Sequence, residues 1–175
     1  MLSLRFPNAH EQNKIATALL NPWAQEWEFL PYWDQCQQDV NQLINYLQDM
    51  KQGINLSAGL VPCSFMLAYD QNQQLVGRVS IRHELNDFLF QEGGHIGYAV
   101  LPEYRYKGYA TDILRQALIY CQDELKLSKV LLTCDDDNIG SLKVIEKNGG
   151  RLENIVQRGN NKTLCRRYWI QLSPS

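Results

Sequence analysis

A basic turn at residues 105–110 carries the residue types needed to hold a phosphate group. Arg105 and Lys107 supply positive charge, and Gly108 allows a ligand to approach the backbone closely. Apolar residues follow at positions 110, 113, 114, 117, 118 and 121, which is helical spacing. The first N–H groups of a helix lack internal partners, and the helix dipole makes that end positive. The turn therefore predicts a binding site for a pyrophosphate.

Two common phosphate-binding motifs do not fit this turn. A P-loop needs a glycine, four residues and then Gly-Lys-Ser/Thr, and the sequence lacks that pattern. The dinucleotide-binding fingerprint needs three glycines, and only Gly108 lies in the loop. A basic surface turn without a ligand is the other interpretation. The pattern that fits is Arg-x-x-Gly-x-Ala between a strand that ends at Val100 and a helix.

A second group of residues follows an apolar strand at 129–134. It comprises Asn138, Ser141, Glu146, Lys147 and Gly149. In this order and spacing, the two groups resemble the two signatures of the GNAT superfamily of N-acetyltransferases. The resemblance covers about residues 60–172 and, more weakly, the N-terminal segment. Residues 93–98 and 144–150 look like a bacterial-type branch of predicted acetyltransferases whose acceptors are generally unassigned.

The resemblance implies acetyl-CoA as cosubstrate, and it implies no metal. In relatives the pantetheine arm inserts between two splayed parallel strands, which correspond here to residues 96–100 and 130–134. The implied coenzyme-binding residues are Tyr98, Ala99, Val100, Arg105, Tyr106, Lys107, Gly108, Tyr109, Ala110, Thr111, Asn138 and Ser141. For Asn138 the alternative is a helix cap, which is a common role of asparagine before a helix.

Three side chains are candidates for the general base that removes a proton from the acceptor amine. His95 begins the first splayed strand, roughly where many relatives carry a glutamate, and histidine titrates in the useful range. The alternative is a histidine at the strand edge that is bonded to a loop carbonyl. Glu92 and His83 flank the same hairpin loop and are weaker candidates, and for Glu92 a solvated loop charge is the favoured alternative.

One position departs from the family pattern. Many relatives carry a tyrosine seven residues after the asparagine, and it is proposed to protonate the departing thiolate. Here that position is Ile145, which has no proton to donate. Either Tyr104, Tyr106, Tyr109 or a water serves instead, or the thiolate leaves unaided, because a thiol pKa of about 8.5 makes it a good leaving group.

An aromatic segment and several aspartates have two interpretations each. The segment contains Trp23, Trp27, Phe29, Tyr32 and Trp33. These side chains either line an acceptor pocket or, as we slightly favour, cover the sheet as core residues. Asp34, Asp39 and the run 135–137 could attract a cationic amine. The run more simply caps the following helix and faces solvent.

Composition argues for a single globular domain without a polyanionic partner. The chain has 175 residues, 45% of them hydrophobic, and a net charge of −2. We therefore expect no nucleic-acid partner, no membrane partner, and a monomer or homodimer. No signal peptide opens the sequence and no apolar run approaches membrane-spanning length, which predicts a cytoplasmic protein.

The five cysteines form no CxxC pair, and the three histidines share no metal-ligand spacing with them. Cys121 lies on the apolar face of the expected helix, and Cys134 ends an apolar strand. We expect both to be small core residues. No metal site is predicted.

The order of predicted elements indicates an α/β (α+β) fold with one domain over residues 1–175. An N-terminal strand and two helices occupy 1–59, the coenzyme-binding core 60–150 and a C-terminal hairpin 151–172. Strands at 64–69 and 75–82 form a hairpin before the motif strand, and a helix is expected from Ile139 to Lys147. We expect a GNAT-like, mostly antiparallel central sheet of about six to seven strands with helices on both faces.

The resemblance implies an enzyme that transfers an acetyl group from acetyl-CoA to a primary amine of a small molecule or protein by direct attack in a ternary complex. Such a transfer needs a neutral amine, alignment and stabilisation of the oxyanion. Two alternatives stay open. One is a non-catalytic module that binds or senses acyl-CoA, and the other is an acyltransferase that uses another acyl-CoA.

Overall fold

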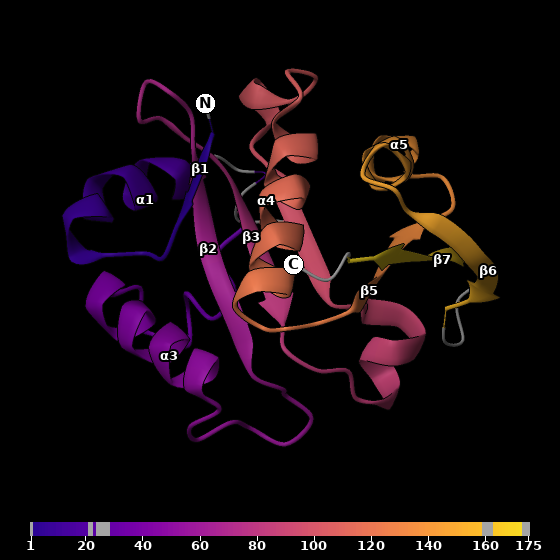
Figure 1. The fold of residues 1–175 in the computed structure, drawn as a ribbon. Helices are drawn as coiled ribbons and strands as arrows, with labels where there is room; N and C mark the ends of the chain where they lie inside the picture. The colour runs from indigo at the N-terminus through magenta and orange to yellow at the C-terminus, as the bar shows by residue number, and fades with distance from the viewer. Residues whose placement is uncertain (1, 21–22, 24–28, 159–162, 173–175) are drawn as a thin grey trace.

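Two antiparallel sheets form the centre of the computed structural model, which describes residues 2–20, 23, 29–158 and 163–172 (Figure 1). The first sheet has the order β1-β2-β3-β4, with bounds Ser3–Arg5, Cys63–Tyr69, Leu75–Arg82 and Ile96–Val100. The second has the order β5-β7-β6, with bounds Lys129–Asp135, Leu164–Gln171 and Arg151–Gln157. The sheets adjoin at β4 and β5.

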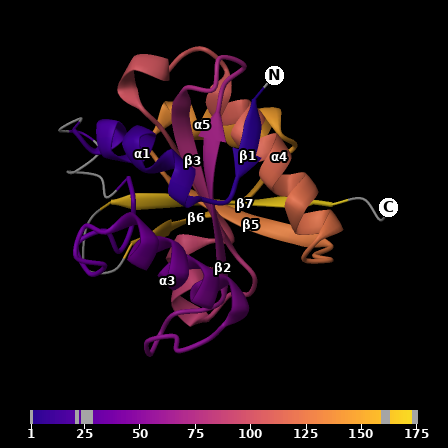
Figure 2. The same cartoon turned by 90° about the vertical axis from the view of Figure 1, so that its left-hand side faces the viewer.

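Helices cover both faces of the first sheet. A short 3₁₀ turn, η1 (Ala9–Glu11), leads into α1 (Gln12–Leu19), and α1 and α3 (Val40–Gln52) cover one face (Figure 2). The opposite face packs against α4 (Tyr109–Asp123). Helix α5 (Ile139–Lys147) lies beside α4 and the second sheet (Figure 1).

This double cover explains why β2 and β3 are buried almost throughout. On β2, Met66 and Ala68 face the α4 side, while Phe65, Leu67 and Tyr69 face α1 and α3. Successive side chains of a strand point to opposite faces, so the two sets belong to two separate cores. On β3, Val79 and Ile81 join the α4 core, which leaves Arg78, Ser80 and Arg82 on the α3 face.

Local sequence signals set the ends of the helices. The Asp39 side chain accepts a hydrogen bond from the Gln42 backbone N–H and caps α3, which ends at Gly53 in the left-handed conformation (φ 72°). Val40, Leu43, Leu47 and Met50 form the buried stripe of that helix. The 3.6-residue periodicity thus turns one face of α3 toward β2.

The expected α+β fold is confirmed, and α5 has the predicted bounds. The motif strand starts at Ile96, one residue after His95, whose backbone N–H bonds to Leu131 instead. Cys121 (0% exposed) and Cys134 (6%) are core residues as expected. Trp27 of the aromatic segment lies outside the described residues. No helix of the described chain is long and apolar enough to cross a membrane.

Candidate active site

Strands β4 and β5 touch at one point and then separate. The His95 backbone N–H donates to the Leu131 carbonyl at 2.7 Å, and the Leu131 N–H donates to Nδ1 of the His95 ring at 2.9 Å. The imidazole therefore occupies the place of a backbone acceptor. Beyond this pair no backbone hydrogen bond joins Ile96–Val100 to the rest of β5. A gap thus opens between the strands from His95 onward.

Gly94 allows the close approach at the vertex of the gap, which is the point where His95 bonds to Leu131. Its φ is +67°, and a Cβ built on it would lie 2.6 Å from the Leu131 carbonyl oxygen. Any side chain here would both clash with backbone and adopt a conformation that L-residues avoid. The glycine before His95 is therefore needed for β4 and β5 to meet.

The backbone of β4 turns polar groups toward the gap, and among them the Val100 carbonyl accepts a hydrogen bond from Arg105 Nε. The Leu101 N–H donates to the Val76 carbonyl of β3 at 3.0 Å, so the backbone of residue 101 faces β3. Backbone groups alternate in direction along a strand, so those of Ala99 also face β3, while those of Tyr98 and Val100 face the gap. A ligand with amide groups, such as a pantetheine arm, could pair with them as an added strand would.

The turn at the far end of the gap has the geometry of an anion site. Gly108 is the N-cap of α4 in a left-handed conformation (φ 84°), and no side chain caps the helix. A Cβ added to Gly108 would meet nothing within 4 Å, so the backbone there is open to a ligand. The uncapped N–H groups of Tyr109, Ala110 and Thr111 lie at the positive end of the helix dipole.

The two cations of this turn make no ion pair with any residue that the structure describes. The Arg105 guanidinium stacks 4.4 Å from the centre of the Trp23 ring, and its Nε donates to the Val100 carbonyl at 3.3 Å. The Lys107 ammonium donates to the Glu103 carbonyl at 3.0 Å. Tyr106 is fully exposed. Both positive charges are therefore available to phosphate oxygens.

Asn138 and Ser141 connect α5 to β4. The Asn138 side chain accepts from the Ser141 N–H at 3.0 Å, which is the capping role considered above. The Tyr98 hydroxyl donates to the Ser141 carbonyl at 3.4 Å, and burial raises the pKa of Tyr98 to about 12. Ile145 is 1% exposed and belongs to the core. Sequence reasoning had not singled out the Tyr98 hydroxyl, which lies where α5 borders β4.

The environment of His95 differs from that of a typical general base. The residue is 7% exposed, and burial lowers its pKa to about 4, with a smaller contribution from the charge of Arg82. Because Nδ1 accepts a hydrogen bond, the neutral ring carries its proton on Nε2. Neither nitrogen then offers a free lone pair. The geometry resembles the bonded strand-edge alternative, with a backbone N–H as the partner instead of a carbonyl.

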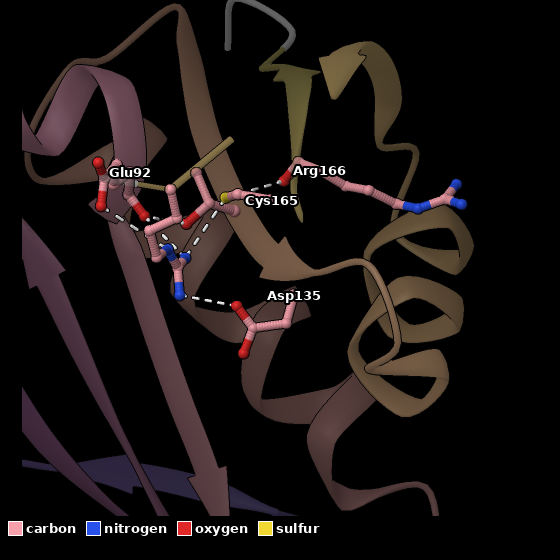
Figure 3. A network of polar contacts seen from close by, with 6 residues as sticks. Glu92, Asp135, Cys165 and Arg166 are labelled. Atoms are coloured by element: carbon pink, nitrogen blue, oxygen red, sulfur yellow. Dashed lines mark hydrogen bonds and ion pairs between the residues drawn. The ribbon is translucent and has the colours of Figure 1, made fainter. Parts of the chain in front are cut away.

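The two weaker base candidates lie in separate polar clusters. Glu92 belongs to η2, a π-helical turn (Leu89–Gly93), and its carboxylate lies 3.8 Å from Arg158 Nε (Figure 3). Arg158 also pairs with Asp135 at 2.7 Å, so this network ties η2 to the second sheet. His83 Nε2 hydrogen-bonds the Ser64 hydroxyl at 2.9 Å, and burial lowers the pKa of its ring.

The aromatic segment contributes mainly to the core, and the acidic run is engaged in ion pairs. Phe29 is fully buried beneath Trp23, with ring centres 6.5 Å apart. Tyr32 also borders a cavity on the α3 face of β3. In the acidic run, Asp136 pairs with Arg166 at 2.6 Å. No group of three or more potential metal ligands occurs among the described residues.

This cavity has a volume of about 370 Å³, and its polar walls were missed by the sequence reasoning. They are Arg78, Ser80 and Arg82, which alternate along β3. Alternation of polar residues in a strand commonly marks a solvent-facing side. In this protein the strand lies between two helical layers, so its polar side faces the cavity instead of solvent.

Residues 2–151 match the model of the acetyltransferase (GNAT) domain. The chain belongs to the GNAT acetyltransferase family. Over 111 residues it is 26% identical to YnaD, an uncharacterized N-acetyltransferase of Bacillus subtilis (strain 168), and the match covers 63% of each chain. The chain thus matches somewhat less than two thirds of the length of that relative.

Solved structures share the fold over nearly the whole chain. The spermidine N-acetyltransferase from Vibrio cholerae, in complex with CoA and spermine, superposes with a TM-score of 0.66 at 20% identity. The match covers 98% of this chain and 95% of that one. A GNAT-family acetyltransferase from Bacillus anthracis gives a TM-score of 0.61 at 20% identity, over 97% and 94% of the two chains. Likeness at these identities establishes the GNAT fold.

Proposed function

We propose that this GNAT protein transfers an acetyl group from acetyl-CoA to a primary amine by direct attack in a ternary complex. The observation that carries the proposal is the gap between β4 and β5, which runs from the vertex at His95 to the uncapped end of α4. One wall of the gap offers unpaired backbone groups, and its far end offers an anion site. The relative from Vibrio cholerae that is solved with CoA and spermine supports this coenzyme class.

In this arrangement the coenzyme lies with its pyrophosphate at Gly108 and the first turn of α4. Arg105 and Lys107 turn from their present carbonyl partners toward phosphate oxygens, where charge-assisted bonds are stronger. The pantetheine arm runs back along the backbone of Val100 and Tyr98. A strand rises ~3.3 Å per residue. One to two residues beyond Tyr98, toward His95, the thioester therefore lies near Gly97 and Ile96.

The chemistry then needs few side chains. The amine nitrogen attacks the thioester carbonyl, the oxygen becomes an oxyanion, and the C–S bond breaks as the carbonyl re-forms. Backbone N–H groups that face the gap are the donors for the oxyanion. The departing thiolate takes a proton from water or from the Tyr98 hydroxyl, because Ile145 has none to give. The amine loses its own proton to water, and alignment in the gap supplies most of the rate.

Thiol release is the direct test of this function. We expect the protein to release CoA from acetyl-CoA only when a primary amine is present, at a rate that saturates in both substrates. The acylated amine, identified by mass, should carry one acetyl group. Trials with succinyl-CoA in place of acetyl-CoA test the alternative that another acyl group is transferred.

A non-catalytic acyl-CoA sensor is the second candidate, and the isoleucine at position 145 favours it because a thiol-protonating tyrosine is missing. The two candidates differ in one outcome. A sensor binds acetyl-CoA by calorimetry and releases no thiol with any amine. Turnover of any amine at a rate above the uncatalysed background rejects the sensor, while tight binding without turnover rejects the transferase.

A further inference from the structure

The cavity on the α3 face of β3 lies beside the expected position of the thioester. Its apolar walls come from α3, from the loop before β2 and from η2, and include Met50, Leu60 and Leu89. At about 370 Å³ its volume is in the range of sites for small molecules. Its polar side is formed by the β3 residues Arg78, Ser80 and Arg82. No aspartate or glutamate lines it among the described residues.

Arg82 presents a donor edge that the described protein leaves unused. Its Nη1 donates to the carbonyls of Gly93 and Gly94 at 3.3 Å and 3.2 Å, which fixes the plane of the guanidinium. Its Nε and Nη2 make no hydrogen bond or ion pair with any residue that the structure describes. These two nitrogens share one edge and donate in parallel, and that geometry matches both oxygens of a carboxylate.

Gly97 connects this arginine to the reacting centre. A Cβ added to Gly97 would lie 3.8 Å from Nη1 and 4.0 Å from Nη2 of Arg82, and 3.2 Å from the Ser80 hydroxyl. A side chain at position 97 would therefore fill the space between the guanidinium and β4. Because the residue is glycine, no side chain of its own stands between the Arg82 guanidinium, which lines the cavity, and the strand along which the pantetheine arm is expected to lie.

We propose that this cavity binds the acceptor, and that the acceptor is a small amine carrying a carboxylate, which pairs with Arg82 while the amine points toward Gly97. This inference rests on the proposed acetyl transfer and adds the substrate class. The apolar walls contact the body of the acceptor. A polycation such as a polyamine is a poor fit, because it would meet the Arg82 guanidinium and no lining carboxylate among the described residues.

The same positive charge offsets the carboxylate of the acceptor, which would otherwise favour the unreactive ammonium form of the amine. A nearby cation disfavours an ammonium ion and thereby lowers the pKa of a bound amine. The charge of Arg82 already acts in this direction on its neighbours, since it lowers the pKa of His95 and opposes the rise that burial gives the Cys63 thiol. The acceptor can then arrive neutral without a dedicated base, which fits the bonded state of His95.

The test compares amines that differ only in the carboxylate. Thiol release at saturating acetyl-CoA is measured with phenylalanine, phenylalanine amide, phenethylamine and spermidine, each rate being corrected for its fraction of neutral amine. We expect kcat/KM for phenylalanine to exceed that for the amide by ~10–100-fold, the usual size of a charge-assisted pair. The lowest value is expected for spermidine.

Arg82→Gln should remove the preference by raising KM for phenylalanine at least ~10-fold while leaving KM for the amide within ~2-fold. Arg151→Gln, an exposed arginine of β6 outside the cavity, is the matched control and should leave both values unchanged. If Arg82→Gln fails to fold, Leu60→Glu tests the same idea from the opposite wall. It should weaken phenylalanine and improve spermidine.

The outcomes separate this inference from the function on which it rests. Absence of thiol release with every amine rejects the proposed function, whether or not acetyl-CoA binds. Turnover of amines that lack a carboxylate, without turnover of any carboxylate-bearing amine, rejects the pocket assignment alone. Equal use of the acid and the amide, faster use of spermidine, or equal losses for both acceptors in Arg82→Gln also overturns it while acetyl transfer stands.

Discussion

At the point where the two sheets meet, the ring of His95 takes the place of a backbone hydrogen-bond acceptor. Its ring nitrogen accepts the Leu131 N–H and its own N–H donates to the Leu131 carbonyl, so both polar groups of Leu131 are satisfied by a single residue. A backbone acceptor in the place of the ring would carry the ladder one step further. The imidazole instead ends it, and the gap for the coenzyme begins there. We therefore regard His95 as a positioning residue.

Two substitutions separate this positioning role from that of a general base. In asparagine the amide oxygen lies close to the place of Nδ1, so His95→Asn retains an acceptor for Leu131, whereas His95→Ala does not. We expect kcat/KM in His95→Asn to stay within ~5-fold of native, while His95→Ala loses ~10-fold or more and also binds acetyl-CoA more weakly.

The pH dependence adds a second readout for the same pair of variants. Because the pKa of His95 is about 4 in the folded chain, the profiles of native protein and His95→Asn should coincide above about pH 5. A general base would behave differently, since both variants would lose ~10²–10⁴-fold in turnover with coenzyme affinity intact. That result would restore the base assignment.

Arg82 shows why part of the site could not be predicted from the sequence. The pattern Arg78, Ser80, Arg82 alternating with Val79 and Ile81 indicates a strand with one polar side. Whether that side faces solvent or a cavity depends on how α3 and η2 cover it, which involves contacts between distant segments. The turn at Gly108 could be singled out from the sequence because its glycine, its two cations and the start of the following helix are close together in the chain.

At the scale of elements, the vertex depends on Gly94 as much as on His95. Its positive φ and the 2.6 Å approach of a would-be Cβ to the Leu131 carbonyl act together. Gly59 is a suitable comparison, because its φ is +84° and a Cβ there would meet nothing within 4 Å. Substitutions at these two glycines therefore separate the cost of a positive φ from the cost of a clash where β4 and β5 approach.

We predict that Gly59→Ala lowers the free energy of unfolding by about 1–2 kcal/mol, the cost of positive φ alone. Gly94→Ala should lower it by about 3 kcal/mol or more, because the clash is with backbone that cannot move aside. Urea unfolding of both variants measures the difference. Equal losses in the two variants would mean that β4 and β5 do not approach as closely at Leu131 as described.

Element boundaries were predictable where local signals coincide. Helix α5 matches because Asn138 caps its start and Gly149 follows its end. The start of β4 lies one residue after His95, because His95 bonds to Leu131, 36 positions away, and no local pattern shows that contact. The division into two sheets has the same origin, because no local pattern shows which strand edge stays unpaired.

At the scale of the whole molecule, the proposed acceptor site and the proposed donor site lie on different sides of the first sheet. The cavity beside Arg82 lies on the α3 face, whereas the anion site lies at the start of α4 on the other side of the first sheet. In the proposed arrangement, the gap between the sheets connects the two sites. Figure 1 shows α3 and α4 on opposite sides of β2 and β3, as this arrangement requires.

The central claim is that the coenzyme enters this gap with its pyrophosphate on the turn at Gly108. Calorimetric titration of acetyl-CoA into native protein, Gly108→Val and Gly149→Val tests it most directly. The two glycines are matched, with φ of +84° and +87° and no atom within 4 Å of an added Cβ. We predict that Gly108→Val weakens binding at least ~10-fold by covering the helix N–H groups, while Gly149→Val binds as native does. Equal affinity in native protein and Gly108→Val would contradict the account.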